Sequence, residues 1–539
     1  MTDDSPRMTA GVHAVEPIHH SRLASGASPR PSIWQRLIRV RRPGDEIRVV
    51  ARCLKCGLRE TKSPSLTTPL AGRPKLSDCR SIPVAMGLCC WAAELGTGSA
   101  AFISLQCARE VKDQDHAMKF VLAFYGTRGD VEPGVAVGRE LRRRGHDVCI
   151  AVPPDLVGFA EAEGLAATAY GPDIQTWLES TRNFWAYFFR NFWRVRDVRA
   201  FLRDSREPGT QRWAEMSTML TSLTHGADLL LTGMSYQELA ASVAEYRDIP
   251  LATLLWFPIR VNGHLVPTLP PSLIRSAMRG YDWLVWRGVK KVEDAQRREL
   301  GLPKATGPAP RRIAERGSLE IQAYDEVCFP GLAAEWAKFD GQRPFVGTLT
   351  LESPTDSDDE VAAWIAAGTP PIFFGFGSIP VESAASTIAM IGRACAQLGE
   401  RALICAAATD FGDAHHFEHV KVVGAMNYAA IFPACRALVH HGGAGTTAAG
   451  LRAGVPTLIL WMADVQLIWG AAVKRLKVGT ARRFSTATEK TLVADLRTIL
   501  APQYAARARE IAARMTKPAQ SVAAAADFVE DFARRKRAG

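Results

Sequence analysis

A glycine-rich turn near the C-terminal end constrains the fold of this chain most. It reads HHGGAGTT over residues 440–447. The apolar run 436–439 before it predicts a buried strand, and the run 457–461 after it predicts the following parallel strand. Between them, residues 444–453 predict a helix that the string GVP at residues 454–456 closes. The sequence therefore predicts the strand, turn, helix and strand unit of a doubly wound α/β domain.

Such a turn suits a negatively charged ligand. Glycines let the backbone approach a ligand closely, and a helix N-terminus offers unpaired N–H groups and the positive end of the helix dipole. A diphosphate fits this environment, although a turn that only packs a helix would carry the same glycines. The residues predicted to hold the diphosphate are His441, Gly442, Gly443, Ala444, Gly445, Thr446 and Thr447.

Two further stretches agree with a ligand site of this kind. Residues 373–378 predict a strand that ends in Gly-Ser, which makes Ser378 a second candidate for phosphate contact. Far upstream, the string GTRGDVEP at residues 126–133 follows the apolar strand predicted at residues 120–124. Both stretches are strand ends, where doubly wound domains bind their ligands.

These elements, in this order, resemble the family 1 glycosyltransferases of the GT-B fold. The resemblance is to the branch that contains sterol glucosyltransferases, glycopeptide-antibiotic glycosyltransferases and glycopeptidolipid glycosyltransferases. Its signature strings are GTRGDVEP near the start and HHGGAGTT followed by GVP near the end. The resemblance covers residues 118–533, and the middle of the chain matches in organisation only.

The resemblance implies an α/β GT-B fold, in which two doubly wound Rossmann-like domains face each other across a cleft. The implied parts are an extension (1–117), an acceptor-binding domain (118–345), a nucleotide-sugar-binding domain (346–502) and a crossover helix with a tail (503–539). The implied activity is inverting transfer of a hexose or deoxyhexose from a UDP- or dTDP-sugar. The acceptor would be a hydroxyl of a sterol, a glycopeptidolipid, a natural product or another apolar molecule.

Asp130 is the candidate general base. It follows the first predicted strand, and this branch of the family carries Gly-Asp where other members carry a catalytic Gly-His pair, here Gly129-Asp130. The alternative is that Asp130 caps a helix predicted over residues 134–144. Arg128 would contact phosphate or hold the Asp130 loop, with an ordinary surface arginine as the alternative.

The donor site departs from the family pattern at one position. The pattern after the strand is Asp-Gln, two variable residues and Trp. Gln466 keeps its spacing to Trp469, but Val465 occupies the Asp position and Asp464 lies one residue early. Asp464 would replace the missing carboxylate, or the donor would be a deoxy-sugar that lacks one polar contact. Gln466 and Trp469 are expected near the sugar, and Asn427 near the nucleobase.

Further expectations concern the remaining elements. The first domain should contain strands at residues 147–152, 228–232 and 251–256. The last helix, at residues 503–535, should pack back across that domain, as it does in the family. The aromatic string FWAYFFRNFW at residues 184–193, with Trp283 and Trp286, would form helix packing, an apolar acceptor groove or a membrane-facing lip.

Composition excludes other partners and cofactors. The net charge of +11 owes much to residues 1–117, and no basic stripe interleaved with aromatic residues accompanies the core, so nucleic acid is not an expected partner. No Asp-x-Asp pair ends a strand, and Cys53-x-x-Cys56 has no second ligand pair at finger spacing. We therefore expect no metal and no cofactor beyond the nucleotide-sugar donor.

Residues 1–117 are rich in Arg, Ser and Pro. Because Met118-Lys119 directly precedes the first strand, we expect translation to start at Met118, with a disordered extension as the alternative. The expected location is the cytoplasm, with peripheral contact to the inner face of the membrane. Two other functions stay open: a nucleotide-sugar 2-epimerase, and a non-catalytic nucleotide- or lipid-binding relative.

Overall fold

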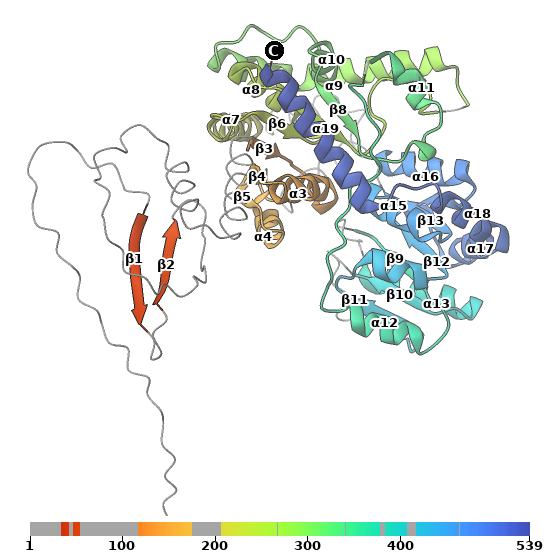
Figure 1. The fold of residues 1–539 in the computed structure, drawn as a ribbon. Helices are drawn as coiled ribbons and strands as arrows, with labels where there is room; N and C mark the ends of the chain where they lie inside the picture. The colour runs from red at the N-terminus through yellow and green to blue at the C-terminus, as the bar shows by residue number, and fades with distance from the viewer. Residues whose placement is uncertain are drawn as a thin grey trace, which may run out of the picture. The chain divides into compact units, whose positions relative to one another are not determined.

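The computed structural model describes residues 34–41, 47–53, 117–174, 206–266, 268–339, 341–377, 383–406, 417–462 and 464–538. The chain divides into two units, Met1–Ala101 and Phe102–Gly539. In the first unit, β1 (Trp34–Arg41) pairs antiparallel with β2 (Ile47–Cys53). The second unit carries two six-stranded sheets (Figure 1).

The first sheet is parallel throughout, in the order β5-β4-β3-β6-β7-β8. Successive residues of β3 enter different cores, Phe120 and Leu122 on one face and Val121 and Ala123 on the other, because side chains alternate along a strand. The strands are β3 Lys119–Ala123, β4 Asp147–Val152, β5 Ala166–Ala169, β6 Leu229–Thr232, β7 Leu251–Leu255 and β8 Leu319–Gln322. The helices are α3 Arg128–Arg143, α4 Val157–Ala162, α7 Arg206–Leu223, α8 Gln237–Arg247, α9 Pro271–Glu299, α10 Ala309–Glu315 and α11 Leu332–Trp336.

The second sheet repeats this arrangement, in the order β11-β10-β9-β12-β13-β14. Its strands are β9 Ile372–Gly375, β10 Ala402–Cys405, β11 Val420–Val423, β12 Ala437–His440, β13 Thr457–Trp461 and β14 Gly479–Arg483. Its helices are α12 Asp358–Ala366, α13 Ala384–Leu398, α14 Tyr428–Ile431, α15 Ala444–Ala453, α16 Asp464–Leu476 and α17 Glu489–Ile499. The expectation of two doubly wound α/β domains is confirmed.

In both sheets the strand order reverses at one point, between β3 and β6 in the first and between β9 and β12 in the second. Open α/β sheets bind ligands beyond the carboxyl ends of the strands at such a point. The string GTRGDVEP directly follows β3, and the turn HHGG begins at the end of β12. Both signature strings therefore lie at the reversal points of their sheets.

Helix α3 begins six residues earlier than expected. We predicted its start at Gly134, and this prediction is wrong: α3 starts at Arg128, with Pro133 in its second turn. The N–H groups of the first turn need other partners, and the Thr127 N–H donates to Asp130 over 2.7 Å. That bond stabilises the early start, while Pro133 leaves the Gly129 carbonyl without its helical donor.

The C-terminal segment forms two helices instead of the single helix expected over residues 503–535. Helix α18 covers Pro502–Ala512 and α19 covers Pro518–Ala538. Helix α19, dark blue in Figure 1, returns to the first domain and packs on α3. There Arg144 donates to Asp527 over 2.6 Å and to the Ala523 carbonyl over 3.1 Å, so the expected packing against the first domain is confirmed. None of the described helices is both long and apolar enough to cross a bilayer.

Helix α9 offers a test of helix stability. Gly288 lies in its interior with ordinary helical backbone, and a Cβ there would meet no atom within 4 Å. Since glycine costs a helix about 0.5–1 kcal/mol relative to alanine, Gly288→Ala is expected to raise the free energy of unfolding in urea by that amount. Gly347→Ala is the contrasting control, because Gly347 has φ +80° and its Cβ would lie 2.6 Å from Ser521 Oγ. A lower stability for Gly288→Ala would contradict the prediction.

Candidate active site

The turn after β12 has the geometry that its glycines suggested. Gly442 has φ +93°, and a Cβ on it would lie 2.9 Å from Ile459 Cγ2 and 3.2 Å from Gln466 Cβ. Only glycine fits this close contact with β13 and α16. Gly443 is the N-cap of α15, which starts at Ala444 as predicted. The first N–H groups of α15 therefore open at the carboxyl edge of the sheet.

His441 follows β12 directly, and its ring lies between Gly377 and Gly443. A Cβ on Gly377 would lie 2.5 Å from the ring, and one on Gly443 would lie 2.6 Å from Nε2. Burial lowers the pKa of His441 to about 4, against a smaller upward effect of a hydrogen bond with Gly375. The ring is therefore neutral at pH 7. Its Nδ1 is buried without a partner among the described residues, so the ring keeps polar capacity for a ligand.

His440 shapes the turn from inside the strand, a role that the sequence did not reveal. It is fully buried at the end of β12, and its Nδ1 accepts the Gly442 N–H over 3.0 Å. Burial lowers its pKa to about 3, so this acceptor stays available at neutral pH. The signal in the sequence was the first His of the HH pair, which directly follows the apolar run of the buried strand.

The two threonines of the first turn differ in their surroundings. Thr447 is fully buried, and its hydroxyl donates to the Gly443 carbonyl over 2.7 Å. Thr446 is half-buried and Gly445 lies beside it. Thr447 thus fixes the start of α15 from within, and Thr446 offers the hydroxyl better placed for a ligand.

Asp130 combines the two roles that the sequence left open. Its Oδ2 accepts the Thr127 N–H over 2.7 Å and the Thr127 hydroxyl over 2.9 Å, so it caps α3 from the third helical position. Its Oδ1 receives no hydrogen bond from the described residues. Burial raises the pKa of Asp130 to about 6, although the bonds from Thr127 lower it. A carboxyl with such a pKa and a free oxygen suits proton transfer near neutral pH.

Close packing holds Asp130 in place. Gly126 has φ +140°, and a Cβ on it would lie 2.4 Å from the Asp130 carboxylate. Gly134 likewise permits contact with Phe124, whose ring would lie 2.4 Å from an added Cβ. The glycines of GTRGDVEPG therefore bring α3 and its carboxylate down onto the end of β3.

Two charged residues of α3, Arg128 and Glu132, lie close to the second domain. Arg128 is exposed. Its Nε lies 3.4 Å from Glu132 Oε2, and its guanidinium carbon lies 4.6 Å from the centre of the Phe159 ring. Glu132, which the sequence analysis did not single out, accepts the Leu351 N–H over 3.0 Å. Burial raises the pKa of Glu132. Arg128 and Glu132 also act on Tyr428, whose pKa is raised mainly by burial, so the start of α3 lies near α14.

The other candidates have varied surroundings. The Gln466 side chain is buried beside Gly442, and its carbonyl accepts the Met462 N–H over 2.7 Å. Asn427 caps α14 by accepting the Ala429 N–H over 3.0 Å, and its amide donates to the Glu352 carbonyl over 3.3 Å. Asp464 starts α16, but its side chain, like Ser378 and residues 184–193, lies outside the described residues.

Trp469 corrects an expectation. We predicted it near the sugar, but its side chain is fully buried. Its ring packs 5.1 Å from Phe329 and 6.4 Å from Phe257, so α16 uses it to pack against the first domain. Gln466 and Trp469 both belong to α16. The Gln466 side chain contacts Gly442 of the turn, whereas the Trp469 side chain enters the core.

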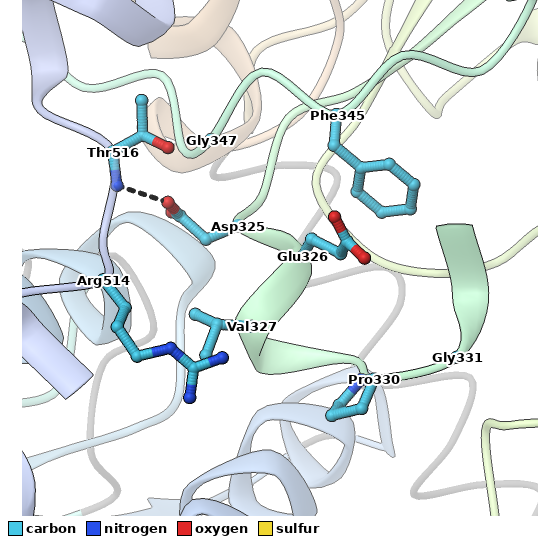
Figure 2. A pocket seen from close by; sticks show the side chains of 9 residues that line it. All are labelled: Asp325, Glu326, Val327, Pro330, Gly331, Phe345, Gly347, Arg514 and Thr516. Carbon is cyan, nitrogen blue, oxygen red and sulfur yellow. Dashed lines mark hydrogen bonds between the residues drawn. The ribbon is translucent and has the colours of Figure 1, made fainter. Parts of the chain in front are cut away.

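A cavity of about 490 Å³ is lined by none of the residues predicted for the site. Its lining comes from two chain segments, as Figure 2 shows: Asp325, Glu326, Val327, Pro330, Gly331, Phe345, Gly347, Arg514 and Thr516. Asp325 is buried there and accepts the Thr516 N–H over 2.6 Å. The carboxylate thus joins the segment after β8 to the segment before α19, and the cavity lies where these two segments meet.

Two family models match this chain, and each of them covers one of the two signature strings. The Erythromycin biosynthesis protein CIII-like C-terminal domain matches residues 394–530, which include the turn after β12. The Glycosyltransferase family 28 N-terminal domain matches residues 120–207, which include Asp130.

Solved structures share the fold at low identity. The glycosyltransferase of kitacinnamycin is similar with a TM-score of 0.58 and 17% identity, over 77% of this chain and 99% of that chain. The glycosyltransferase VinC in complex with DTDP has a TM-score of 0.51 and 18% identity, over 78% of this chain and 100% of that chain. These likenesses confirm the GT-B fold.

Sequence relatives are much closer. An uncharacterized glycosyltransferase of Mycobacterium tuberculosis is 62% identical over 423 residues, which are 78% of this chain and 100% of that protein. A sterol 3-beta-glucosyltransferase of Arabidopsis thaliana is 26% identical over 428 residues, which are 76% of this chain and 67% of that protein. Because the identity to the mycobacterial protein extends over its whole length, this chain belongs to the family 1 glycosyltransferases of the GT-B fold and is an enzyme, a glycosyltransferase.

Proposed function

We propose that the enzyme moves a hexose or deoxyhexose from a UDP- or dTDP-sugar to a hydroxyl of an apolar, lipid-like acceptor, with inversion at the anomeric carbon. A structural neighbour in complex with DTDP supports a nucleoside diphosphate donor. The sterol 3-beta-glucosyltransferase among the relatives supports an apolar acceptor.

One observation carries the proposal: a half-buried carboxylate of raised pKa and an open helix N-terminus occupy the reversal points of the two sheets. In this mechanism Asp130 Oδ1 takes the proton from the acceptor hydroxyl. The acceptor oxygen bonds to the anomeric carbon while the bond from that carbon to the diphosphate breaks. The diphosphate leaves with the bonding electron pair, and a single displacement of this kind inverts the anomeric centre.

The growing negative charge needs donors that are in place beforehand. We assign this role to the first N–H groups of α15, with Gly442, Gly443, Ala444 and Gly445, and to His441, Thr446 and Ser378. Gln466 or Asp464 would hold the sugar, Asn427 would lie by the nucleobase, and Arg128 and Gly129 would line the opposite side. Since helix N–H groups bind phosphate by themselves, we propose that transfer needs no metal, and activity should persist in EDTA.

A donor panel tests the function. UDP- and dTDP-linked hexoses and deoxyhexoses are incubated with the enzyme, and nucleoside diphosphate release is followed with and without sterols and glycolipids that carry free hydroxyls. We expect slow release from one donor class, faster release with an acceptor, and a product whose anomeric configuration by NMR is opposite to that of the donor. A product that retains the configuration would refute the inverting mechanism.

The same panel addresses the two other functions that the sequence left open. An epimerase would convert the donor into a different sugar without an acceptor, and a pure binding protein would release no diphosphate. Membership of a glycosyltransferase family favours transfer over both. A comparison of hexose and deoxyhexose donors also tests Val465, which is exposed where the family pattern has an aspartate.

A further inference from the structure

An apolar surface accompanies the first half of helix α9. Eleven large hydrophobic side chains of the described residues are strongly exposed, and seven of them fall within residues 266–285. Tyr281 is 69% exposed, Leu284 64% and Trp283 50%. The full set is Val266, Leu269, Leu273, Tyr281, Trp283, Leu284 and Val285. We call it the α9 surface.

The α9 surface is not the side by which the helix packs on the protein. The inward side carries Ile274 and Trp286, both buried, and the half-buried Met278 and Asp282, at the four-residue spacing of one helix face. An ordinary surface helix has polar residues opposite that stripe. Here the exposed sides of α9 carry large apolar side chains, among them Leu273, Trp283 and Leu284, and such an exposed apolar patch marks a surface for a partner.

The charges around the α9 surface are positive. Arg279, Arg287 and Lys291 are exposed on α9, and Arg287 lies 5.5 Å from the centre of the Trp283 ring. Asp282 is the one carboxylate in residues 271–292. It is half-buried, burial raises its pKa, and the charges that act on it are those of Arg260 and Glu238. The exposed side therefore combines aromatic and aliphatic side chains with cations that form no ion pair with any of the described residues.

The chain connects this surface to the edge of the sheet that holds Asp130. Residues 256–270 leave the carboxyl end of β7 and lead into α9. Parallel strands share that edge, so the loop starts on the same side of the sheet as the GTRGD loop after β3. An apolar acceptor that arrives along α9 would thus approach the proposed base.

We propose that the α9 surface docks on an anionic lipid membrane, a partner that rests on the proposed lipid-like acceptor. Aromatic and aliphatic side chains would enter the boundary between headgroups and acyl chains. Arg279, Arg287 and Lys291 would meet the negative surface potential. Charge decides between occupants: a second copy of this surface would bring like charges together, whereas an anionic bilayer complements them.

The test measures binding of the full chain to vesicles by sedimentation. Vesicles of phosphatidylcholine alone are compared with vesicles that also contain phosphatidylglycerol, at low and high salt. We expect salt-sensitive binding to the anionic vesicles. Arg279→Glu with Arg287→Glu should weaken it by at least about tenfold, since each basic residue near the surface contributes strongly. Tyr281→Ser with Trp283→Ser and Leu284→Ser should weaken binding to a similar degree.

Lys490→Glu with Arg497→Glu on α17 is the matched control, because it reverses two exposed cations of the other domain, and it should bind as the unmodified chain does. Absence of binding to anionic vesicles, or α9 variants that bind like the control, would overturn the proposal. A change from dimer to monomer in the α9 variants without loss of vesicle binding would assign the surface to a second copy and also overturn it. Diphosphate release in the absence of vesicles is measured in parallel, so that a failure of the transferase proposal is recognised separately.

Discussion

Asp130→Asn is expected to lower the rate of sugar transfer by about 10²–10⁴-fold, the usual contribution of a general base. Asparagine has the same shape and can still accept the Thr127 N–H, which now reaches Asp130 Oδ2 over 2.7 Å. It cannot take a proton from the acceptor hydroxyl. Donor affinity, measured by calorimetry, should therefore be almost unchanged while the single-turnover rate falls. A stable variant with the original rate would remove Asp130 from the mechanism.

Asp155→Asn serves as the matched control. Asp155 follows β4 at the same edge of the sheet, and its carboxylate likewise accepts a backbone N–H, that of Ile174 over 3.2 Å. If the loss in Asp130→Asn came only from disturbed loop structure, the control should lose activity as well. We expect the control to keep its transfer rate.

The pH dependence of Asp130 gives a second signature of the same role. Because its pKa is raised from 3.8 to about 6, the carboxylate form needed for proton transfer is lost as the pH falls through 6. The rate should therefore decline on the acid side, and Asp130→Asn should lose this limb. The free energy of unfolding has the opposite pH dependence. Because the folded chain binds the Asp130 proton more tightly than the unfolded chain, this proton stabilises the fold fully below pH 3.8, and that stabilisation is lost as the pH rises to about 6. At pH 8 the asparagine variant should melt no lower than the unmodified chain.

Strands and helices were predicted correctly from the sequence where the spacing of apolar residues and the residues that end an element indicate the same bounds. The strands Asp147–Val152 and Thr457–Trp461 and the helix Ala444–Ala453 have the bounds expected. The start of α3 was missed because the bond between Thr127 and Asp130 that stabilises an earlier start is a side-chain contact. Local pattern therefore fixes element type better than element ends.

Side-chain roles were harder to predict than elements, because they depend on tertiary contacts. Trp469 has the family spacing to Gln466, yet it packs on Phe329 and Phe257 from distant parts of the chain. Thr447 was expected to face phosphate, but a backbone carbonyl one turn earlier takes its hydroxyl. The glycines were predicted more securely, since Gly442 has both positive φ and no room for a Cβ.

His441→Ala should weaken the binding of nucleoside diphosphate and of the intact nucleotide-sugar alike, by about 1.5–3 kcal/mol for a hydrogen bond to a charged group. The reason is its position: the ring lies between Gly377 and Gly443 at the start of α15, where the diphosphate is proposed to bind. Burial lowers its pKa to about 4, so the neutral ring acts as a hydrogen-bond donor, and the loss should be the same from pH 6 to pH 8 (about two units above that pKa and beyond).

Two variants make the His441 result specific. His441→Gln keeps an N–H donor of similar reach and should recover part of the affinity, which a merely structural role of the ring would not explain. His419→Ala is the control, because His419 lies in the same domain, where its Nε2 is 2.9 Å from the Gly392 carbonyl and its ring packs on Phe417. Calorimetric titration of each variant with UDP, dTDP and the preferred donor measures the effect. Equal affinity of His441→Ala and the unmodified chain for all three ligands would mean that the diphosphate binds elsewhere.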